Sequence, residues 1–405
     1  MMMKTPIAAA AAAAASCKVW VRSSGPCIFG RSIYENLKTR NQISYNTSEK
    51  SLASARPVAS APSTSYHCDR MLVDFEERTD GSVVLTPSSI DGSERISPRS
   101  SATNPRSMHR GIPLGRAGDC PTLTPRASQD DAFDRRRRPF ASLAVVGMVV
   151  VDGEATKRDP TYQPHPSGDG SFPPPSVLLV TRRPSYMRSF PGAFVFPGGN
   201  VDADDASLAH ALSREIAEET GLNLPVDTWK LECLWESIYP THLPPPLPVE
   251  GGSEEAKGAI KAHHLVCYFS GNLPDQTEQQ QQYQQQRWKP KDSLNLCEEE
   301  VDGAVWLSHK NMRGILEATE QLSTLKDEDS DDHERDPCDD QTVTLHSTRN
   351  IGSNQETQIH LSDLAGIYPR LDQTDGHFCG IAQGSLFALE EYMKRVHGEE
   401  TKQTK

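Results

Sequence analysis

The stretch that decides the fold is Phe196-Pro-Gly-Gly-Asn-Val-Asp-Ala-Asp-Asp205, followed after eight intervening residues by Arg214-Glu-Ile-Ala-Glu-Glu-Thr-Gly-Leu222. The first part is rich in Gly and Asp, a composition typical of a loop. The second part lies in segment 207–220, whose apolar residues recur with the period of an α-helix. Gly221 is a helix stop signal. The sequence therefore predicts a Gly-rich loop that leads into a helix ending near Gly221.

Two glutamates of this helix share a side with its core leucines. On a wheel of about 100° per residue, with Leu208 at 0°, Leu212 falls at about 40°, Glu215 at about −20° and Glu219 at about 20°. Glu218 falls at about −80° and points further out. Carboxylates at a buried edge lose hydration, repel one another and face the negative end of the helix dipole. Divalent cations would compensate these costs, and carboxylate oxygens suit Mg²⁺ or Mn²⁺. The alternative is a solvated acidic face, which the overlap with the apolar face disfavours.

The pattern resembles the Nudix box, in which a Gly, five residues, a Glu and seven residues precede Arg-Glu-U-x-Glu-Glu-x-Gly-U, where U is aliphatic. The second half matches at every fixed position: Arg214, Glu215, Ile216, Glu218, Glu219, Gly221 and Leu222. The first half departs from it. Counting from Gly199, Asp205 stands where the family has its first Glu, and one extra residue precedes Arg214. The resemblance covers Pro139 to about Glu317.

This resemblance implies an α/β fold, the Nudix α/β/α sandwich around a mixed sheet, and a Mg²⁺- or Mn²⁺-dependent hydrolase that cleaves a diphosphate bond. Glu218 and Glu219 would be the main metal ligands. Glu215 would be a third ligand or would help to deprotonate water. Arg214 would pair with these glutamates, and the carbonyl of Gly199 would face a metal.

Glu300 stands just before a predicted strand, where several Nudix enzymes carry a loop general base. The alternative for Glu300 is a solvated acid in the run Glu298–Glu300. A catalytically weak Nudix-fold binding module is the alternative to an enzyme, but all three box glutamates are present, which favours the enzyme.

A second resemblance concerns the substrate. The spacing of Arg188, Gly192 and Phe196-Pro-Gly-Gly199 is similar to the R-x3-G-x3-F-P-G-G signature of coenzyme A diphosphatases. It implies substrate contacts from Arg188, Gly192, Phe196 and Gly198; alternatively, the loop only shapes the hairpin. Leu234–Pro240, His263-His264 and Glu300-Val301 ahead of Trp306-Leu307 resemble the nucleoside diphosphate-linked moiety X motif 17 branch, whose members have been linked to capped nucleotides and grouped with NADH diphosphatases.

Around the box, the composition predicts one compact domain between long segments without order. Gly and Pro number 27 and 30, only 36% of residues are hydrophobic, and the mean hydropathy is −0.58, so much of the chain cannot bury enough apolar surface to fold. We expect a targeting segment or a low-complexity Ala tract at 1–40, disorder at 41–138, the Nudix domain at 139–318, a disordered acidic insertion at 319–358 and a C-terminal segment at 359–405. Insertions into the domain are expected near 152–175, 244–262 and 274–296.

Within the domain, β-branched and apolar runs predict strands, and strands alternate with helices as in α/β proteins. The expected strands are 140–151, 177–181, 229–239, 264–270 and 303–307. An amphipathic helix at about 380–396 is expected to pack on the domain.

Charge and cysteine content exclude several function classes. The net charge is −13, and residues 139–405 hold twenty more acids than bases. An acidic body argues against an extended nucleic-acid surface, and the predicted partner is a small nucleotide-linked diphosphate. No run of 18 apolar residues occurs, so no membrane span is expected. The nine cysteines form no C-x-x-C pair, which excludes a zinc ribbon. The N-terminal composition favours a mitochondrion or another organelle, or otherwise the cytoplasm.

Overall fold

The chain forms two compact units in a computed structural model. The model describes residues 18–22, 25–27, 32–38, 68–88, 108–117, 141–151, 177–187, 189–239, 262–273, 294–324, 341–347, 356–367, 370–371 and 378–403. Unit 1 takes residues 1–144, 200–208 and 232–267, and unit 2 takes residues 145–199, 209–231 and 268–405. Among the described residues, no helix is long and apolar enough to cross a membrane.

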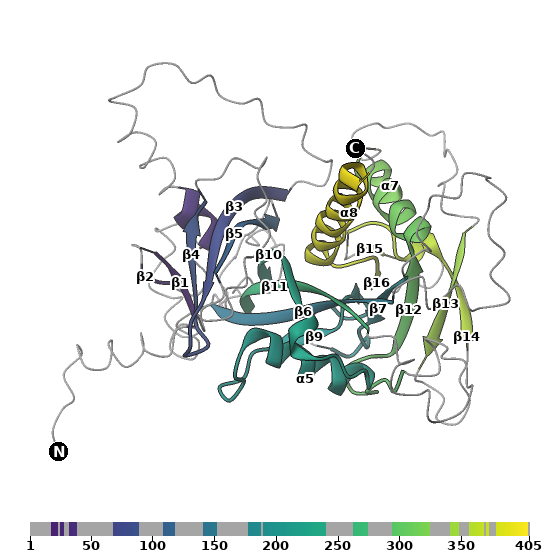
Figure 1. The fold of residues 1–405 in the computed structure, drawn as a ribbon. Coiled ribbons are helices and arrows are strands. Elements are labelled where there is room, and N and C mark those ends of the chain that lie inside the picture. Colours follow the sequence, from purple (N-terminus) through teal and green to yellow (C-terminus); the bar gives the residue numbers. More distant parts are fainter. Residues whose placement is uncertain are drawn as a thin grey trace, which may run out of the picture. The chain divides into compact units, whose positions relative to one another are not determined.

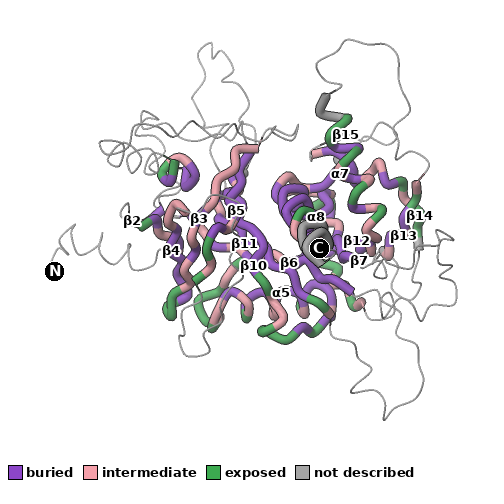
Figure 2. Tube along the Cα trace, turned by 45° about the horizontal axis from the view of Figure 1, so that its top comes forward, coloured by how far each residue is buried: buried purple, intermediate pink, exposed green. Residues whose placement is uncertain are grey.

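Unit 2 contains a sheet with the strand order β14-β13-β12-β7-β6. Its strands are β6 (Ser142–Val151, of which residues from Val145 belong to this unit), β7 (Val177–Arg182), β12 (Gly303–Ser308), β13 (Thr342–Ser347) and β14 (Glu356–His360). β12 pairs antiparallel with both β7 and β13. Most residues of β6, β7 and β12 are buried, as the purple segments of Figure 2 show. These strands form the centre of the unit's core.

Several short elements complete unit 2. β8 (Phe194–Val195) pairs with β7, and β9 (Gly198–Asn200) pairs with β6. β15 (Arg370–Leu371) and β16 (Phe378–Cys379) form a separate antiparallel pair. The 3-10 helices are η2 (Val226–Thr228) and η5 (Leu361–Asp363).

Three helices cover the sheet of unit 2: α5 (Leu208–Thr220), α7 (His309–Thr324) and α8 (Gln383–Gln403). In Figure 1, α5 lies on one side of β6 and β7, and α7 and α8 lie on the other, which gives the α/β/α arrangement. α5 packs directly on β6 at Gly147, where a Cβ atom would lie 3.0 Å from Ile216 and 3.2 Å from Leu212. Since larger side chains would push the helix away, this glycine fixes how closely α5 approaches the sheet.

Unit 1 contains the strand order β10-β5-β3-β4-β1-β2. The strands are β1 (Val19–Val21), β2 (Gly25–Pro26), β3 (Cys68–Glu77), β4 (Val83–Pro87), β5 (Met108–Ala117) and β10 (Lys230–Tyr239), the last from Glu232 on. β3 pairs antiparallel with β4 and β5, whereas β1–β4 and β5–β10 are parallel pairs. Both strand directions therefore occur, as expected for a mixed sheet. β11 (Ala262–Asn272) contributes its residues up to Cys267 to this unit.

The expectation of disorder at 41–138 is wrong for three stretches, which form β3, β4 and β5. Their apolar signals are short: in β3 only Val73 and Phe75 are buried, and in β4 only the run Val83–Leu85 is. Such short alternation between polar residues is a weak signal, and the strands gain stability from partners far away in sequence, such as Leu114 paired with Leu234. Disorder at 319–358 is likewise wrong where α7 continues to Thr324 and where β13 and the first residues of β14 form a hairpin.

Residues of the expected targeting segment belong to the core of unit 1. Val19 and Val21 on β1 are buried, as are Ile33 and Leu37 of a short helix at 33–38. A targeting segment that is removed on import would therefore have to end before β1.

The short helix at 33–38 is held by a buried carboxylate. Glu236 accepts hydrogen bonds from the amides of Ile33 (2.6 Å) and Tyr34 (3.0 Å) and from the hydroxyl of Ser32 (2.9 Å). His263, fully buried, lies 3.1 Å from the same carboxylate. Burial alone would raise the pKa of Glu236, but the hydrogen bonds from His263 and the two amides outweigh it and lower that pKa. The N-terminal residues thus satisfy a charge in the middle of unit 1.

The strands and the helix predicted around the box are confirmed within one to three residues by β6, β7, α5, β10, β11 and β12. The predicted C-terminal helix is confirmed as α8, which continues further than expected. The predicted insertions near 152–175, 244–262 and 274–296 lie almost entirely outside the described residues.

Candidate metal site

α5 carries two buried glutamates on one face. Glu215 and Glu219 lie one turn apart, with exposed fractions of 9% and 5%, whereas Glu218 is exposed. This is the distribution that the 3.6-residue period predicts, because Glu215 and Glu219 share the sector of Leu208 and Leu212. The helix packing that buries the leucines therefore also buries two negative charges.

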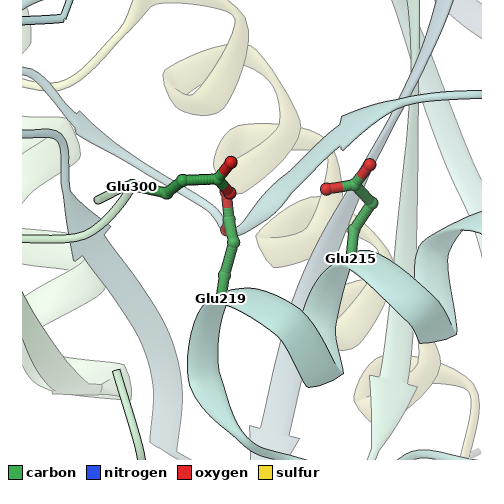
Figure 3. A group of neighbouring side chains, drawn as sticks. All are labelled: Glu215, Glu219 and Glu300. Carbon is green, nitrogen blue, oxygen red and sulfur yellow. The ribbon is translucent and has the colours of Figure 1, made fainter. Parts of the chain in front are cut away.

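A third carboxylate joins them from another segment. Oxygen atoms of Glu215, Glu219 and Glu300 all lie within 4.8 Å of one another. Figure 3 shows Glu215 and Glu219 projecting from α5 and Glu300 reaching toward Glu219 from the turn before β12. Glu300 itself is exposed. We call these three residues the carboxylate cluster; it has one open side and two buried members.

Backbone hydrogen bonds bring the segment before Glu300 to the end of α5. The amide of Asn295 donates to the carbonyl of Thr220 (2.9 Å), and the amide of Cys297 donates to the carbonyl of Glu219 (3.0 Å). These bonds satisfy two of the carbonyls that a helix leaves unpaired at its C-terminus. Gly221, with φ of 73°, allows the chain to turn there.

The other end of the same segment is fixed to β7. The amide of Asp302 donates to the carbonyl of Arg182 (2.9 Å), and the guanidinium of Arg182 donates to the Asp302 carboxylate (2.6 Å). The Asp302 side chain is 7% exposed. Glu300 is therefore held between two anchored ends.

The Gly-rich loop meets the helix at Gly198 and Gly199. The amide of Gly198 donates to the Glu219 carboxylate over 2.9 Å. Gly198 has φ of 149°, and a Cβ atom there would clash with the backbone carbonyl of Val145. A Cβ atom at Gly199 would lie 2.7 Å from Oε1 of Glu215. Both glycines are needed for the loop to approach the cluster this closely.

Burial makes the cluster electrostatically unfavourable without a cation. Burial raises the pKa of Glu219 to about 8; the Gly198 amide and Arg183 oppose this rise, and Glu300 adds to it. Burial also raises the pKa of Glu215, against the opposing effect of Arg214. Without a cation, Glu219 therefore favours its protonated form near neutral pH.

Arg214 supplies part of that charge from the edge of the cluster. One guanidinium nitrogen lies 3.0 Å from Oε1 of Glu215 and 3.0 Å from Oε2 of Glu218. Glu218 thus faces Arg214 and lies outside the carboxylate cluster among the residues that the model describes.

The donor set fits a divalent cation of the hard type. All three side chains offer carboxylate oxygens, which Mg²⁺, Mn²⁺ and Ca²⁺ prefer over nitrogen and sulfur ligands. Burial raises the pKa of Glu219, which disfavours its negative charge, and such an ion would bring the compensating positive charge. Glu215, Glu219 and Glu300 are the residues that would hold it.

The remaining predicted site residues have mixed placements. Arg188 lies outside the described residues. Gly192 has φ of 76°, a conformation that favours glycine, and Phe196 is 2% exposed and belongs to the core. Asp205 accepts a hydrogen bond from the amide of Asp202 (2.8 Å), which is a local turn within unit 1.

Two residues of the loop after β7 were missed by the sequence interpretation. Arg183 lies close enough to lower the pKa of Glu219, and its Nε donates to the carbonyl of Ser189 (3.2 Å). Tyr186 donates from its hydroxyl to backbone carbonyls next to Glu300. Neither has a periodicity or motif signal, because both contacts depend on how two loops meet.

Comparison with known proteins places the chain in a family. The NUDIX domain model matches residues 168–324. The chain is similar to the Danio rerio protein named m7GpppN-mRNA hydrolase NUDT17, with 31% identity over 288 residues, which cover 71% of this chain and 78% of the relative. It is 34% identical over 224 residues to the Homo sapiens protein of the same name, covering 54% of this chain and 58% of that protein. A solved MutT/nudix family protein from Enterococcus faecalis matches 67% of this chain and 71% of that chain, with 12% identity and a TM-score of 0.29.

Proposed function

We propose, because the chain belongs to the Nudix family and is a hydrolase acting on phosphorus-containing anhydrides, that it uses Mg²⁺ or Mn²⁺ to cleave the diphosphate bond of a nucleoside-diphosphate-linked compound. The observation that carries this proposal is the convergence of Glu215, Glu219 and Glu300 within 4.8 Å. A compound with two linked phosphates needs charge neutralisation before a nucleophile can approach, and among the described residues this cluster could hold a cation that provides it.

In this proposal the buried glutamates hold the cation and the exposed one handles the proton. Glu215 and Glu219 would bind through carboxylate oxygens, together with the carbonyl of Gly199. When bound, a divalent cation neutralises the diphosphate and lowers the pKa of a water molecule. Glu300, exposed and beside Glu219, would accept the proton from the attacking water.

Neighbouring groups keep these carboxylates oriented. The Gly198 amide fixes one oxygen of Glu219, and Arg214 holds Glu215 from the side. Glu218 would contribute a further carboxylate to a cation at the cluster's edge by turning away from Arg214. No covalent intermediate is needed, since water attacks the phosphorus directly. The proton that Glu300 accepts from this water would then pass to the leaving phosphate.

The substrate is proposed from two sources. The name of the relatives, m7GpppN-mRNA hydrolase, makes a capped nucleotide, m7GpppN, the first compound to test. The spacing of Arg188, Gly192 and Phe196–Gly199, which is similar to that of coenzyme A diphosphatases, makes CoA a second compound to test. NADH and a dinucleoside polyphosphate are included because they contain the same kind of diphosphate bond. The net charge of −13 supports a small nucleotide-linked partner over extended nucleic-acid binding.

The test is a substrate panel with the full chain. Capped dinucleotide, capped RNA oligonucleotides of increasing length, CoA, NADH and a dinucleoside tetraphosphate are incubated with Mg²⁺, Mn²⁺ or EDTA, and products are separated by chromatography. We expect metal-dependent release of two phosphate-containing products from at least one compound, with a rate that does not rise with RNA length. Glu219→Gln is the matched inactive control. Binding of these compounds without turnover by the folded wild type would refute the enzyme and support the binding-module alternative.

A further inference from the structure

A single hydroxyl group joins the loop after β7 to the turn that carries Glu300. Oη of Tyr186 lies 2.9 Å from the carbonyl oxygen of Glu298 and 3.0 Å from that of Glu299. A phenol has one proton, so the two carbonyls share it or exchange it between them. Tyr186 follows β7 in the chain, whereas Glu298 and Glu299 come more than a hundred residues later.

The turn itself is exposed at its apex. Glu298, Glu299 and Glu300 are all exposed, and the carbonyl of Cys297 closes the turn by accepting from the amides of Glu300 (3.1 Å) and Val301 (2.8 Å). Its two ends are anchored to α5 and β7 by the bonds described above. The hydroxyl of Tyr186 contacts the apex, between these two ends.

The negative charges of the turn favour a displacement of its apex away from the cluster. The three consecutive glutamates repel one another, and they repel the carboxylates on α5 when these are ionised. Because the turn is exposed, water would stabilise its side chains in positions further from one another and from α5. Keeping Glu300 within 4.8 Å of Glu215 and Glu219 therefore requires contacts that hold the backbone of the turn in place. A donor aimed at two adjacent carbonyls restricts the orientation of both peptide groups just before Glu300.

Tyr186 is poorly explained as a core residue. It is 69% exposed, so its ring buries little apolar surface and contributes little to packing. Removing the hydroxyl alone leaves that small contribution unchanged. The contact with the turn is thus the part of Tyr186 that a phenylalanine would lack.

We propose that Tyr186 is a positioning residue: its hydroxyl holds the turn 298–300 so that the Glu300 carboxylate stays beside Glu215 and Glu219. This inference rests on the proposed function of the cluster and assigns a role to a residue outside the Nudix box. Because the hydroxyl acts through the backbone of the turn, its effect should depend on the presence of the Glu300 carboxylate.

A double-mutant cycle tests this dependence. Full-length wild type, Tyr186→Phe, Glu300→Gln and the double variant are compared in Mn²⁺ affinity by calorimetry and in kcat and KM for the capped dinucleotide. Loss of one hydrogen bond predicts a fall of about 3- to 10-fold in Mn²⁺ affinity or kcat for Tyr186→Phe, with KM nearly unchanged. In the Glu300→Gln background, the same change should have less than about a twofold effect.

Amide exchange and a matched control separate positioning from general damage. Exchange at the amides of Glu300 and Val301 should accelerate in Tyr186→Phe. Tyr34→Phe removes the same kind of bond, from a phenol to the carbonyl of Arg70 (3.0 Å), in unit 1 and should leave Mn²⁺ affinity unchanged.

Three results would overturn the assignment: wild-type affinity and exchange in Tyr186→Phe, an equal loss with and without the Glu300 carboxylate, or an equal loss in Tyr34→Phe. Failure of the proposed function looks different, because then the capped dinucleotide and the other diphosphates are not cleaved by wild type, while Mn²⁺ affinity and amide exchange still report on the turn.

Discussion

The backbone amide of Gly198 donates a 2.9 Å hydrogen bond to the carboxylate of Glu219, a residue that is only 5% exposed. When Glu219 is ionised, its charge makes this bond stronger than one between neutral groups. It joins the Gly-rich loop to the helix whose glutamates form the cluster. The loop therefore orients the most buried carboxylate of the cluster, in addition to allowing close approach.

Replacing Glu219 by Gln should lower kcat by about two orders of magnitude or more, because the change removes a buried ligand for the cation while keeping the volume of the side chain. Glu218→Gln should also lower kcat, but less, since its carboxylate is exposed and faces Arg214. Steady-state kinetics at saturating Mg²⁺, with a melting curve for each variant, check this. A Glu219→Gln enzyme with near wild-type rates would refute the assignment of the cluster.

The two glycines of the loop should respond differently to alanine. A Cβ atom at Gly198 meets the backbone of Val145, which cannot move easily, so Gly198→Ala should lower the free energy of unfolding. At Gly199 the Cβ atom meets the carboxylate of Glu215, the far end of a flexible side chain. Gly199→Ala should therefore retain the fold but have a lower kcat. Thermal melts and kinetics on both variants distinguish them; equal stability loss would contradict this contrast.

Stability without metal should fall as pH rises. The pKa of Glu219 is about 8 in the folded chain against an ordinary 4.5, so between these values the folded state binds more protons than the unfolded state. The free energy of unfolding then decreases with rising pH, by at most about 1.4 kcal/mol per pH unit for one group. Urea titrations in EDTA at pH 5, 6.5 and 8 measure this slope.

Two controls accompany that measurement. Mn²⁺ should restore stability most at pH 8, where the ionised cluster needs a cation. Glu219→Gln should flatten the profile, and an unchanged slope in this variant would show that another group causes it.

Deleting residues 1–40 should destabilise unit 1. Glu236 would lose the donors at Ser32, Ile33 and Tyr34 and remain buried with a charge that has fewer partners. Loss of such a network costs on the order of 3 kcal/mol or more. Limited proteolysis and melting of a 41–405 chain against the full chain measure this, with Ser32→Ala as the smallest matching change. A truncated chain as stable as the full one would contradict the role given to this segment.

Arg188→Ala should discriminate among substrates. If Arg188 donates to an anionic group, its loss costs about 1.5–3 kcal/mol, or roughly 10- to 150-fold in kcat/KM. The value of kcat/KM should then fall more for CoA, which carries an additional 3′-phosphate, than for NADH. Measuring kcat/KM for both on wild type and variant gives the ratio, and an equal loss on both would remove the CoA interpretation.

Hydrophobic periodicity predicted which residues are buried within one helix or strand. It did not predict the contacts between elements. The burial of Glu215 and Glu219 follows from a helix period, and the run before Val151 is apolar enough to predict a strand. The strands β3, β4 and β5 of unit 1 were missed. In β3 only Val73 and Phe75 are buried among many polar residues, and β5 pairs with Leu234 far along the chain. The position of Glu300 and the contact of Tyr186 depend on loops that no local pattern describes.

The strand pairing of unit 1 has a consequence for its folding during synthesis. β5 pairs in parallel with β10, so that Leu114 meets Leu234, more than a hundred residues later. The N-terminal strands therefore leave the ribosome long before their last neighbour, and the edge of β5 stays open while residues 145–199 of unit 2 are translated. Pairings this distant also slow folding, because a long loop must close first. Nascent chains halted before Leu234 should thus depend on chaperones more than chains halted after β11.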